Sequence, residues 1–245
     1  MSPQFSDDLY LGPVYRGGPL SDGPAPMDIG IGPLGRIYVF DVVPLTLQAA
    51  GLAALQQTAG AANLVLTAGT GVTTQVGPDG VTRYVLDTPR CVTLTSAGNL
   101  AAVTFTVTGY DQYGQLMTQA LAGPNANTVA TLKAFKSITR VAVSAAVGAD
   151  VSVGFNDTLG LPIRVIGAGY VASVKWAGVL AADAGTFVAA VQTSPATNAT
   201  GDVRGTYTPS SAADGSRRLV MAIAVPAIGC GPNATRVGAL GVTQA

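Results

Sequence analysis

Residues 103–114 carry the pattern that most restricts how this chain can fold. Val103, Phe105 and Val107 alternate with three threonines, and a glycine-bounded turn follows them. Successive side chains leave a strand on opposite faces, so this period of two predicts a half-buried strand whose apolar side chains face a core. Residues 115–121 are predicted to return as its antiparallel partner.

The same kind of pattern recurs from residue 62 to residue 160. Short runs rich in Val, Thr and Leu are separated by turn sequences, of which Gly77-Pro78-Asp79-Gly80 is the strongest. The predicted strands are 64–67, 72–76, 82–86, 90–95, 103–108, 115–121, 127–132, 137–144 and 150–155. Several short strands with frequent turns are typical of an antiparallel sandwich. We therefore predict an all-β chain whose main domain is one β-sandwich over residues 62–160.

Three other segments complete the predicted organisation. Residues 1–36 form an extended arm, because Gly-Pro sequences interrupt them too often for a helix or an inner strand. Residues 37–61 begin with a connecting strand and continue, over 46–57, as an irregular segment with an extended start, since Gly51 weakens the helix that Leu and Ala favour. Residues 161–245 form a smaller β-rich C-terminal region with an extended tail, either a second small domain or an extension of the sandwich.

The predicted arm also carries large apolar side chains. The clearest are Phe5, Tyr10, Leu11, Val14 and Tyr15. A purely disordered tail would have fewer such residues. An arm that docks them on a neighbouring subunit explains both the apolar residues and the Gly-Pro punctuation, and an arm folded back on its own domain is the alternative. These five residues are the candidate partner-docking site.

The charge content narrows the classes of function. The formal net charge is zero, from 13 basic and 13 acidic residues, and only 11% of residues are charged, against roughly 25% in soluble proteins. A nucleic-acid binder needs a concentrated basic face, so nucleic acid is not an expected partner. So few charges indicate surfaces that neighbouring subunits cover, although a small-residue β protein from a GC-rich genome would have the same composition.

Catalysis is not expected from these residue types. The chain contains no His, and all 13 of its acidic residues are Asp. The usual general acid–base residue near neutral pH is therefore missing, and Ser-His or Cys-His arrangements are impossible within this chain. A Ser–Lys pair with Lys133, Lys136 or Lys175 stays formally open, but a solvated or rim position is expected for Lys133 and Lys136. We predict no catalytic residue and no cofactor.

Metal binding and membrane insertion are not expected either. Two Cys cannot form a four-thiolate zinc site, and Asp79, Asp111 and Asp157 are interpreted as turn residues because no calcium-loop spacing appears. Cys91 and Cys230 would either pair or stay as separate thiols. No targeting segment is visible, and polar residues interrupt the longest Ala/Leu-rich run, so no membrane span is predicted.

Several strand-and-turn segments resemble structural proteins from the virions of tailed bacteriophages. These segments are 89–95, 104–114, 133–136, 151–165, 201–209 and 215–219, within residues 80–225. The resemblance implies a β-rich, non-enzymatic protein without cofactors that is made in the host cytoplasm and occurs in many copies in the virion. Its expected partners are other virion proteins, the major capsid protein first among them, and further copies of itself.

The resemblance does not place the protein within the particle. The leading expectation is a capsid cement or decoration protein at the edges between major capsid subunits, and a tail or head–tail connector protein is the alternative. A host-receptor or glycan-binding module is a third hypothesis, which would need exposed aromatic platforms. The candidates for such platforms are Trp176, Tyr170, Tyr110, Tyr113 and Tyr207. Aromatic residues in strands belong to a core more often than to a platform.

Overall fold

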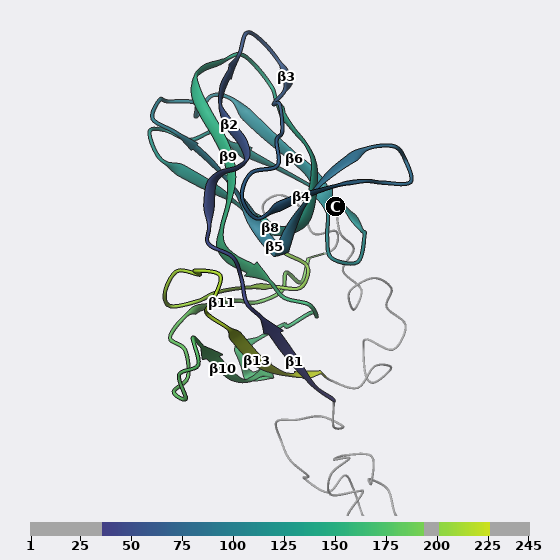
Figure 1. Cartoon of the computed structure of the whole chain (residues 1–245), viewed down its shortest axis with the longest axis vertical. Coiled ribbons are helices and arrows are strands. Elements are labelled where there is room, and N and C mark those ends of the chain that lie inside the picture. Colours follow the sequence, from purple (N-terminus) through teal and green to yellow (C-terminus); the bar gives the residue numbers. More distant parts are fainter. Residues whose placement is uncertain (1–35, 194–200, 226–245) are drawn as a thin grey trace, which may run out of the picture.

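The computed structural model describes residues 36–193 and 201–225, which form two antiparallel β-sheets and one short 3₁₀ turn, η2 (Ala168–Tyr170) (Figure 1). The predicted all-β, antiparallel fold class is confirmed. The strands of the larger sheet are β2 (Gln48–Thr58), β3 (Ala62–Asn63), β4 (Val72–Val76), β5 (Thr82–Ser96), β6 (Thr104–Tyr110), β7 (Leu116–Ala122), β8 (Thr128–Val143), β9 (Val147–Gly160), β11 (Thr186–Val188) and β12 (Thr206–Thr208). Those of the smaller sheet are β1 (Arg36–Val42), β10 (Val171–Trp176) and β13 (Leu219–Val225).

The larger sheet curls around the main hydrophobic core. Its strands follow the order β11-β12-β9-β5-β8-β6-β7, while β2 is added to β9, β3 to β8 and β4 to β5. Figure 1 shows most of the curled sheet in the upper part of the view, and β1, β10 and β13 in the lower part together with β11, at the end of the larger sheet. The main core takes buried apolar side chains from β2, β5, β6, β8 and β9. This arrangement gives the larger sheet its sandwich-like character.

The β6–β7 hairpin has the register that the sequence predicts. Phe105 and Val107 are fully buried in the main core, and Val103 lies just before β6 in the same core. Phe105 is opposite Leu121 in the pairing with β7. The turn is held by Asp111, whose Oδ1 accepts hydrogen bonds from the backbone N–H groups two and four residues later. Alternation between an apolar core and a more polar outer face therefore decides the register here.

Some strands are longer than the sequence pattern predicts. The runs predicted over 82–86 and 90–95 are one strand, β5, which passes through Pro89. The pairing of β5 with β8 shifts register between Val85 and Arg90. Proline donates no backbone hydrogen bond and is tolerated where a strand ladder is irregular. A long strand with such a shift can bend, which helps one sheet curl around a single core.

The prediction of an irregular segment over residues 46–57 is wrong. Strand β2 covers most of it and pairs with β9, and Leu52 and Ala53 are buried in the main core. The pairing shifts register three times, which removes the strict alternation that identifies a strand in a sequence. The main core therefore includes residues that precede position 62, where the sandwich was predicted to begin.

A second core lies beside the smaller sheet. It includes Trp176 and Tyr207, and it also takes Leu159 from β9, the strand that supplies Phe155 to the main core. Strand β12 pairs with the end of β9. The boundary that the sequence predicts near residues 156–162 thus falls at the end of a strand that both cores share. Because β1 pairs with β13 over its whole length, the smaller sheet joins the beginning and the end of the described chain.

Candidate functional site

The five predicted docking residues, Phe5, Tyr10, Leu11, Val14 and Tyr15, lie outside the described residues, as does Cys230. Their role stays a prediction. The described chain begins with strand β1, at the end of the predicted arm. The exposed side chains closest in sequence to the arm therefore belong to β1 and to the residues that follow it.

Exposed apolar side chains are concentrated in the first twenty described residues. Of the sixteen large hydrophobic residues that are exposed in the described part of the chain, seven lie between positions 37 and 55. They are Ile37, Tyr38, Val39, Val43, Leu45, Leu47 and Leu55. Single exposed hydrophobic residues are normal, and contiguous patches of them mark interaction sites, so this concentration along the sequence is a candidate for one. We refer to these seven residues as the N-terminal apolar segment.

The N-terminal apolar segment begins on a sheet edge. Strand β1 pairs with β13 on one side, and no other described strand pairs with it. An edge strand presents backbone N–H and C=O groups that can pair with another strand. Such strand addition combines main-chain hydrogen bonds with pockets for alternate side chains. β1 therefore offers both backbone groups and apolar side chains to a partner.

The sequence contained a signal for this segment that the strand prediction did not use. Ile37, Tyr38 and Val39 are three consecutive large apolar residues within one strand. Neighbouring residues in a strand face opposite sides, so such a run makes both faces of the strand apolar. In the edge strand β1, these three side chains are all exposed in the described structure.

A buried ionic cluster fixes the backbone between β1 and β2. The guanidinium of Arg90, which is fully buried, donates to the backbone O of Leu45 at 2.6 Å. The N–H of Leu45 donates to Asp87 Oδ2 at 2.8 Å. Arg90 also pairs with Asp87 at 2.7 Å and with Asp157 at 3.3 Å. The side chain of Leu45 stays exposed while its backbone is held in place, so the connection is presented to solvent in a defined position.

Every nitrogen of the Arg90 guanidinium has a partner. Nε donates to Asp87 at 2.9 Å, and Nη1 donates to the backbone O of Asn156 at 3.2 Å. Burial raises the pKa of Asp157, against the opposing effect of the Ala213 N–H and of Arg90. A buried charge is tolerated only when it is paired in this way. The cluster is therefore a structural junction between β5, β9 and the segment that links the two sheets.

The prediction of a solvated or rim position is wrong for Lys133, which lies inside the fold, whereas half-buried Lys136 is compatible with a rim position. Lys133 is buried and donates from Nζ to the backbone O of Thr118 at 3.0 Å. Half-buried Lys136 donates to the backbone O of Leu86 at 2.6 Å and of Asp87 at 3.0 Å. Burial lowers the pKa of both ammonium groups. A lysine can bury its long apolar stem when its amine reaches a carbonyl, which sequence spacing does not reveal.

Two further buried groups are also bound into the structure. Asp202 accepts hydrogen bonds from the N–H of Ala134 at 2.9 Å and of Arg204 at 2.8 Å, and burial raises its pKa. Cys91 is a buried free thiol whose pKa is raised by burial. A buried protonated thiol is a poor nucleophile. Asp202 and Cys91 therefore belong to the packed interior.

The aspartates interpreted as turn residues divide into two kinds. Asp79 and Asp111 each accept backbone hydrogen bonds within their own turns, as predicted. Asp157 is different, because it lies in β9 and binds Arg90. Within residues 36–193 and 201–225, no group of three or more potential ligands is placed to hold a metal ion. In the same ranges, no helix is long and apolar enough to cross a membrane.

The aromatic residues considered as binding platforms are mostly covered. Trp176 and Tyr207 are buried in the second core, and Tyr170 packs against it. Arg83 lies over the ring of Tyr110, 4.1 Å from its centroid. Tyr113 is exposed, but its hydroxyl donates to the backbone O of Pro162 at 2.6 Å. These contacts match packing roles better than an open platform.

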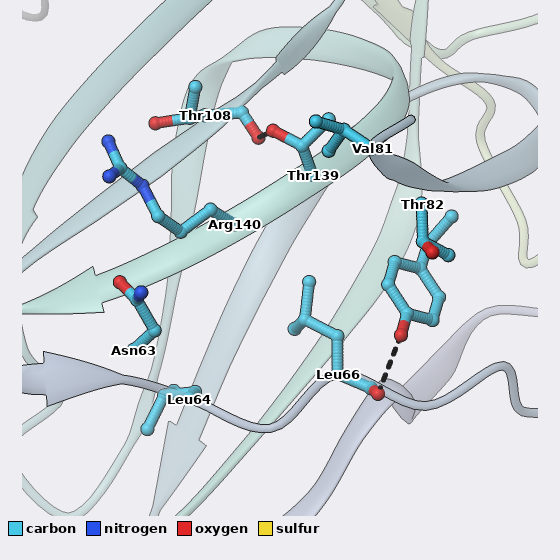
Figure 2. Close-up of a pocket in the computed structure, with 9 residues that line it drawn as sticks. Asn63, Leu64, Leu66, Val81, Thr82, Thr108, Thr139 and Arg140 are labelled. Carbon is cyan, nitrogen blue, oxygen red and sulfur yellow. Dashed lines mark hydrogen bonds between the residues drawn. The ribbon is translucent and has the colours of Figure 1, made fainter. Parts of the chain in front are cut away.

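A hollow of about 450 Å³ lies on the larger sheet, where β3 and β5 separate along β8 (Figure 2). β5 pairs with β8 as far as Ile138, and β3 pairs with it from Ala142. The lining between these points includes Thr139 and Arg140. The hollow thus combines a cationic side chain with neighbouring apolar ones, including Leu66 (Figure 2).

No protein-family model, curated protein or solved structure matches this chain. The candidate site therefore rests on the geometry of the chain itself. It consists of the N-terminal apolar segment, the unpaired edge of β1 and the buried junction that holds them.

Proposed function

We propose that this chain is a non-enzymatic structural component of a tailed-phage particle, a multi-copy capsid cement or decoration protein that stabilises contacts between major capsid subunits. The observation that carries the proposal is the N-terminal apolar segment, which begins on an open strand edge directly after the predicted arm. The choice of a tailed-phage particle is supported by the resemblance of segments within residues 80–225 to virion proteins.

The free energies of burial and ordering are those of a contact that binds weakly as a single copy and strongly when many copies attach to one particle. Fully burying one exposed Val, Leu or Ile side chain contributes about 1.5–3 kcal/mol. Ordering a partner segment costs about 1–2 kcal/mol for each backbone residue fixed. The two effects are of similar size, so the balance is set by main-chain pairing and by attachment at several points of one particle.

The use of the ionisable groups supports a role without catalysis. Arg90, Lys133 and Asp202 are buried, and each is hydrogen-bonded to backbone or side-chain groups of the fold. A catalytic acid or base must instead reach a substrate. The chemistry-bearing residues of the interior are thus engaged in holding the fold together.

A tail or head–tail connector protein is the alternative position within the particle. A connector protein is usually arranged in rings, whereas a cement protein is distributed over the whole capsid. Averaged images of the intact particle, combined with the copy number per particle, separate these two positions. Binding of the purified chain to host cells or glycans would instead favour a surface receptor-binding module.

A matched pair of substitutions tests the apolar segment. Val39 in β1 and Val188 in β11 are 56% and 55% exposed, and each lies on an edge strand. Val39→Asp should abolish retention on the particle, whereas Val188→Asp should leave it unchanged. Both variants should keep the wild-type thermal midpoint, because neither position is in a core. Equal retention of both variants would place the interface elsewhere.

Removing the predicted arm tests its part in the same contact. A chain lacking residues 1–30 should fold with an unchanged thermal midpoint and yet fail to stay on the particle. Retention equal to that of the full chain would show that residues 1–30 take no part in attachment.

A further inference from the structure

The aspartates of the described chain are all engaged within the fold. Each of the nine accepts a hydrogen bond or forms an ion pair. They are Asp41, Asp79, Asp87, Asp111, Asp150, Asp157, Asp183, Asp202 and Asp214. The other four, Asp7, Asp8, Asp22 and Asp28, belong to residues 1–35, where Arg16 is the single basic residue. The first 35 residues therefore carry a formal side-chain charge of −3, four acidic against one basic, in a chain whose total is zero.

Arg140 is a cation that the described fold leaves available. It is exposed on β8, and its guanidinium forms no hydrogen bond or ion pair with any residue in 36–193 or 201–225. It lies directly opposite Thr108 in the pairing of β6 with β8. The Oγ1 atom of Thr108 is buried and has no hydrogen-bond partner among these residues. A guanidinium and an unused hydroxyl are thus held side by side.

The hollow of Figure 2 surrounds this pair. Asn63 is opposite Ala142, two residues along β8 from Arg140, so it shares the face on which Arg140 and Thr108 lie. Figure 2 shows Arg140, Thr108 and Asn63 toward one end of the hollow and Leu66 and Val81 toward the other. The polar end suits a carboxylate, because guanidinium, hydroxyl and amide groups all donate hydrogen bonds. The apolar end suits a hydrophobic side chain next to that carboxylate.

The sequence Phe5-Ser6-Asp7-Asp8-Leu9-Tyr10 has this composition, with two carboxylates followed by Leu9 and Tyr10 and preceded, one residue away, by Phe5. We propose that this stretch of a second copy of the chain docks in the hollow and pairs Asp7 or Asp8 with Arg140. A volume of about 450 Å³ lies within the range of about 300–1,000 Å³ that ligand sites occupy. This inference rests on the proposed function, since it names the surface on which the arm attaches.

The proposed role between subunits favours a second copy over the same chain, and the position of β1 is compatible with it. Figure 1 shows the N-terminal end of β1 pointing away from the larger sheet, whereas the hollow lies on that sheet beside β3 and β6. A contact between the arm of one copy and the body of the next is head-to-tail, and it extends to rings or arrays. One exposed ion pair stabilises only slightly, so the contact gains strength when many copies are held on one particle.

A charge exchange in the full-length chain tests the pairing. Self-association is measured by sedimentation over a range of protein concentrations at low ionic strength. Arg140→Glu should weaken it about tenfold, because it replaces an attraction by a like-charge repulsion. The double substitution Asp7→Lys with Asp8→Lys should weaken it similarly, and combining all three changes should restore it. All variants should keep the wild-type thermal midpoint.

Lys175 provides the matched control. It is exposed, and its ammonium group also has no partner among the described residues, but it lies on β10, away from the hollow. Lys175→Glu should leave self-association within about twofold of wild type. An equal loss with Lys175→Glu, or no recovery in the triple variant, would overturn the proposal. A wild-type chain that is monomeric at every concentration would overturn docking on a second copy.

The outcomes distinguish this inference from the proposed function. If the wild-type chain is found in purified particles but Arg140→Glu does not change self-association, the docking fails and the structural role stands. If the charge exchange behaves as expected but the chain is absent from particles, the docking stands and the structural role fails.

Discussion

The junction around Arg90 and the hollow around Arg140 use the same side chain in opposite ways. Arg90 is fully buried, and its guanidinium is bonded to Asp87, Asp157 and the backbone O of Leu45. Arg140 is exposed, and its guanidinium has no partner among the described residues. A buried charge must find its partners within its own chain, whereas an exposed one can be completed by another molecule. The Arg90 junction thus holds the fold together, and the exposed guanidinium of Arg140 is compatible with the assembly role that we propose for it.

A substitution in the main core gives the reference value for the loss of unfolding free energy in the other two regions. Phe105→Ala should lower the free energy of unfolding by about 3–5 kcal/mol, because the ring is fully buried and its removal leaves a cavity. Denaturant unfolding followed by fluorescence or circular dichroism gives this value. A loss below about 1 kcal/mol would mean that the β6 register or the burial of this ring is wrong.

Arg90→Met tests the junction. The substitution keeps the unbranched aliphatic stem but removes the guanidinium, so the carboxylates of Asp87 and Asp157 lose their cation. Removing one partner of a buried ion pair costs about 3–5 kcal/mol, so the loss should approach that of Phe105→Ala in the same unfolding measurement. A loss under about 1 kcal/mol would show that the cluster is dispensable and would remove the contrast with Arg140.

Asp202→Asn tests a buried carboxylate that is held by backbone N–H groups. The NH₂ group of the new amide would face one of the backbone N–H groups of Ala134 or Arg204, which are also donors. The free energy of unfolding should therefore fall by about 1–3 kcal/mol at neutral pH. Burial raises the pKa of Asp202 above its ordinary value of 3.8, so the folded state binds this proton more tightly than the unfolded chain does. The stabilising effect of protonated Asp202 is therefore complete below pH 3.8 and is lost as the pH rises through the folded-state pKa.

The difference in unfolding free energy between wild type and Asp202→Asn should consequently shrink as the pH increases from about 3.8, and then level off. Urea unfolding of both proteins over a pH series measures it. A difference that grows with pH would mean that the pKa of Asp202 is lowered in the folded state.

Arg140→Met should have the smallest effect on stability. The guanidinium has no partner among the described residues, and such surface changes usually stay within about 0.5 kcal/mol. It is the same substitution as at Arg90, so the two unfolding curves compare the regions directly. A loss above about 1 kcal/mol would place Arg140 among the residues that hold the fold and would weaken its assignment to assembly.

Local patterning predicted the hairpin well, and long-range contacts explain where prediction failed. The alternation at Val103, Phe105 and Val107 was sufficient to predict the strand, its register and its buried face. It was not sufficient over residues 46–57, because β2 pairs with β9 through three register shifts. For the candidate site, the sequence pointed to the arm before residue 36, whereas the N-terminal apolar segment after it emerged from the exposure of each side chain.

By itself, the sequence determined the all-β class, the antiparallel hairpins and the lack of His and Glu, because these depend on residue type and on neighbours a few positions away. The tertiary structure decided which charged side chains are buried and which are exposed. Arg90 and Lys133 became interior residues and Arg140 stayed at the surface, although nothing in their local sequences separates them. The reason is that burial and pairing depend on partners such as Leu45 and Asp157, which are 45 and 67 residues away from Arg90.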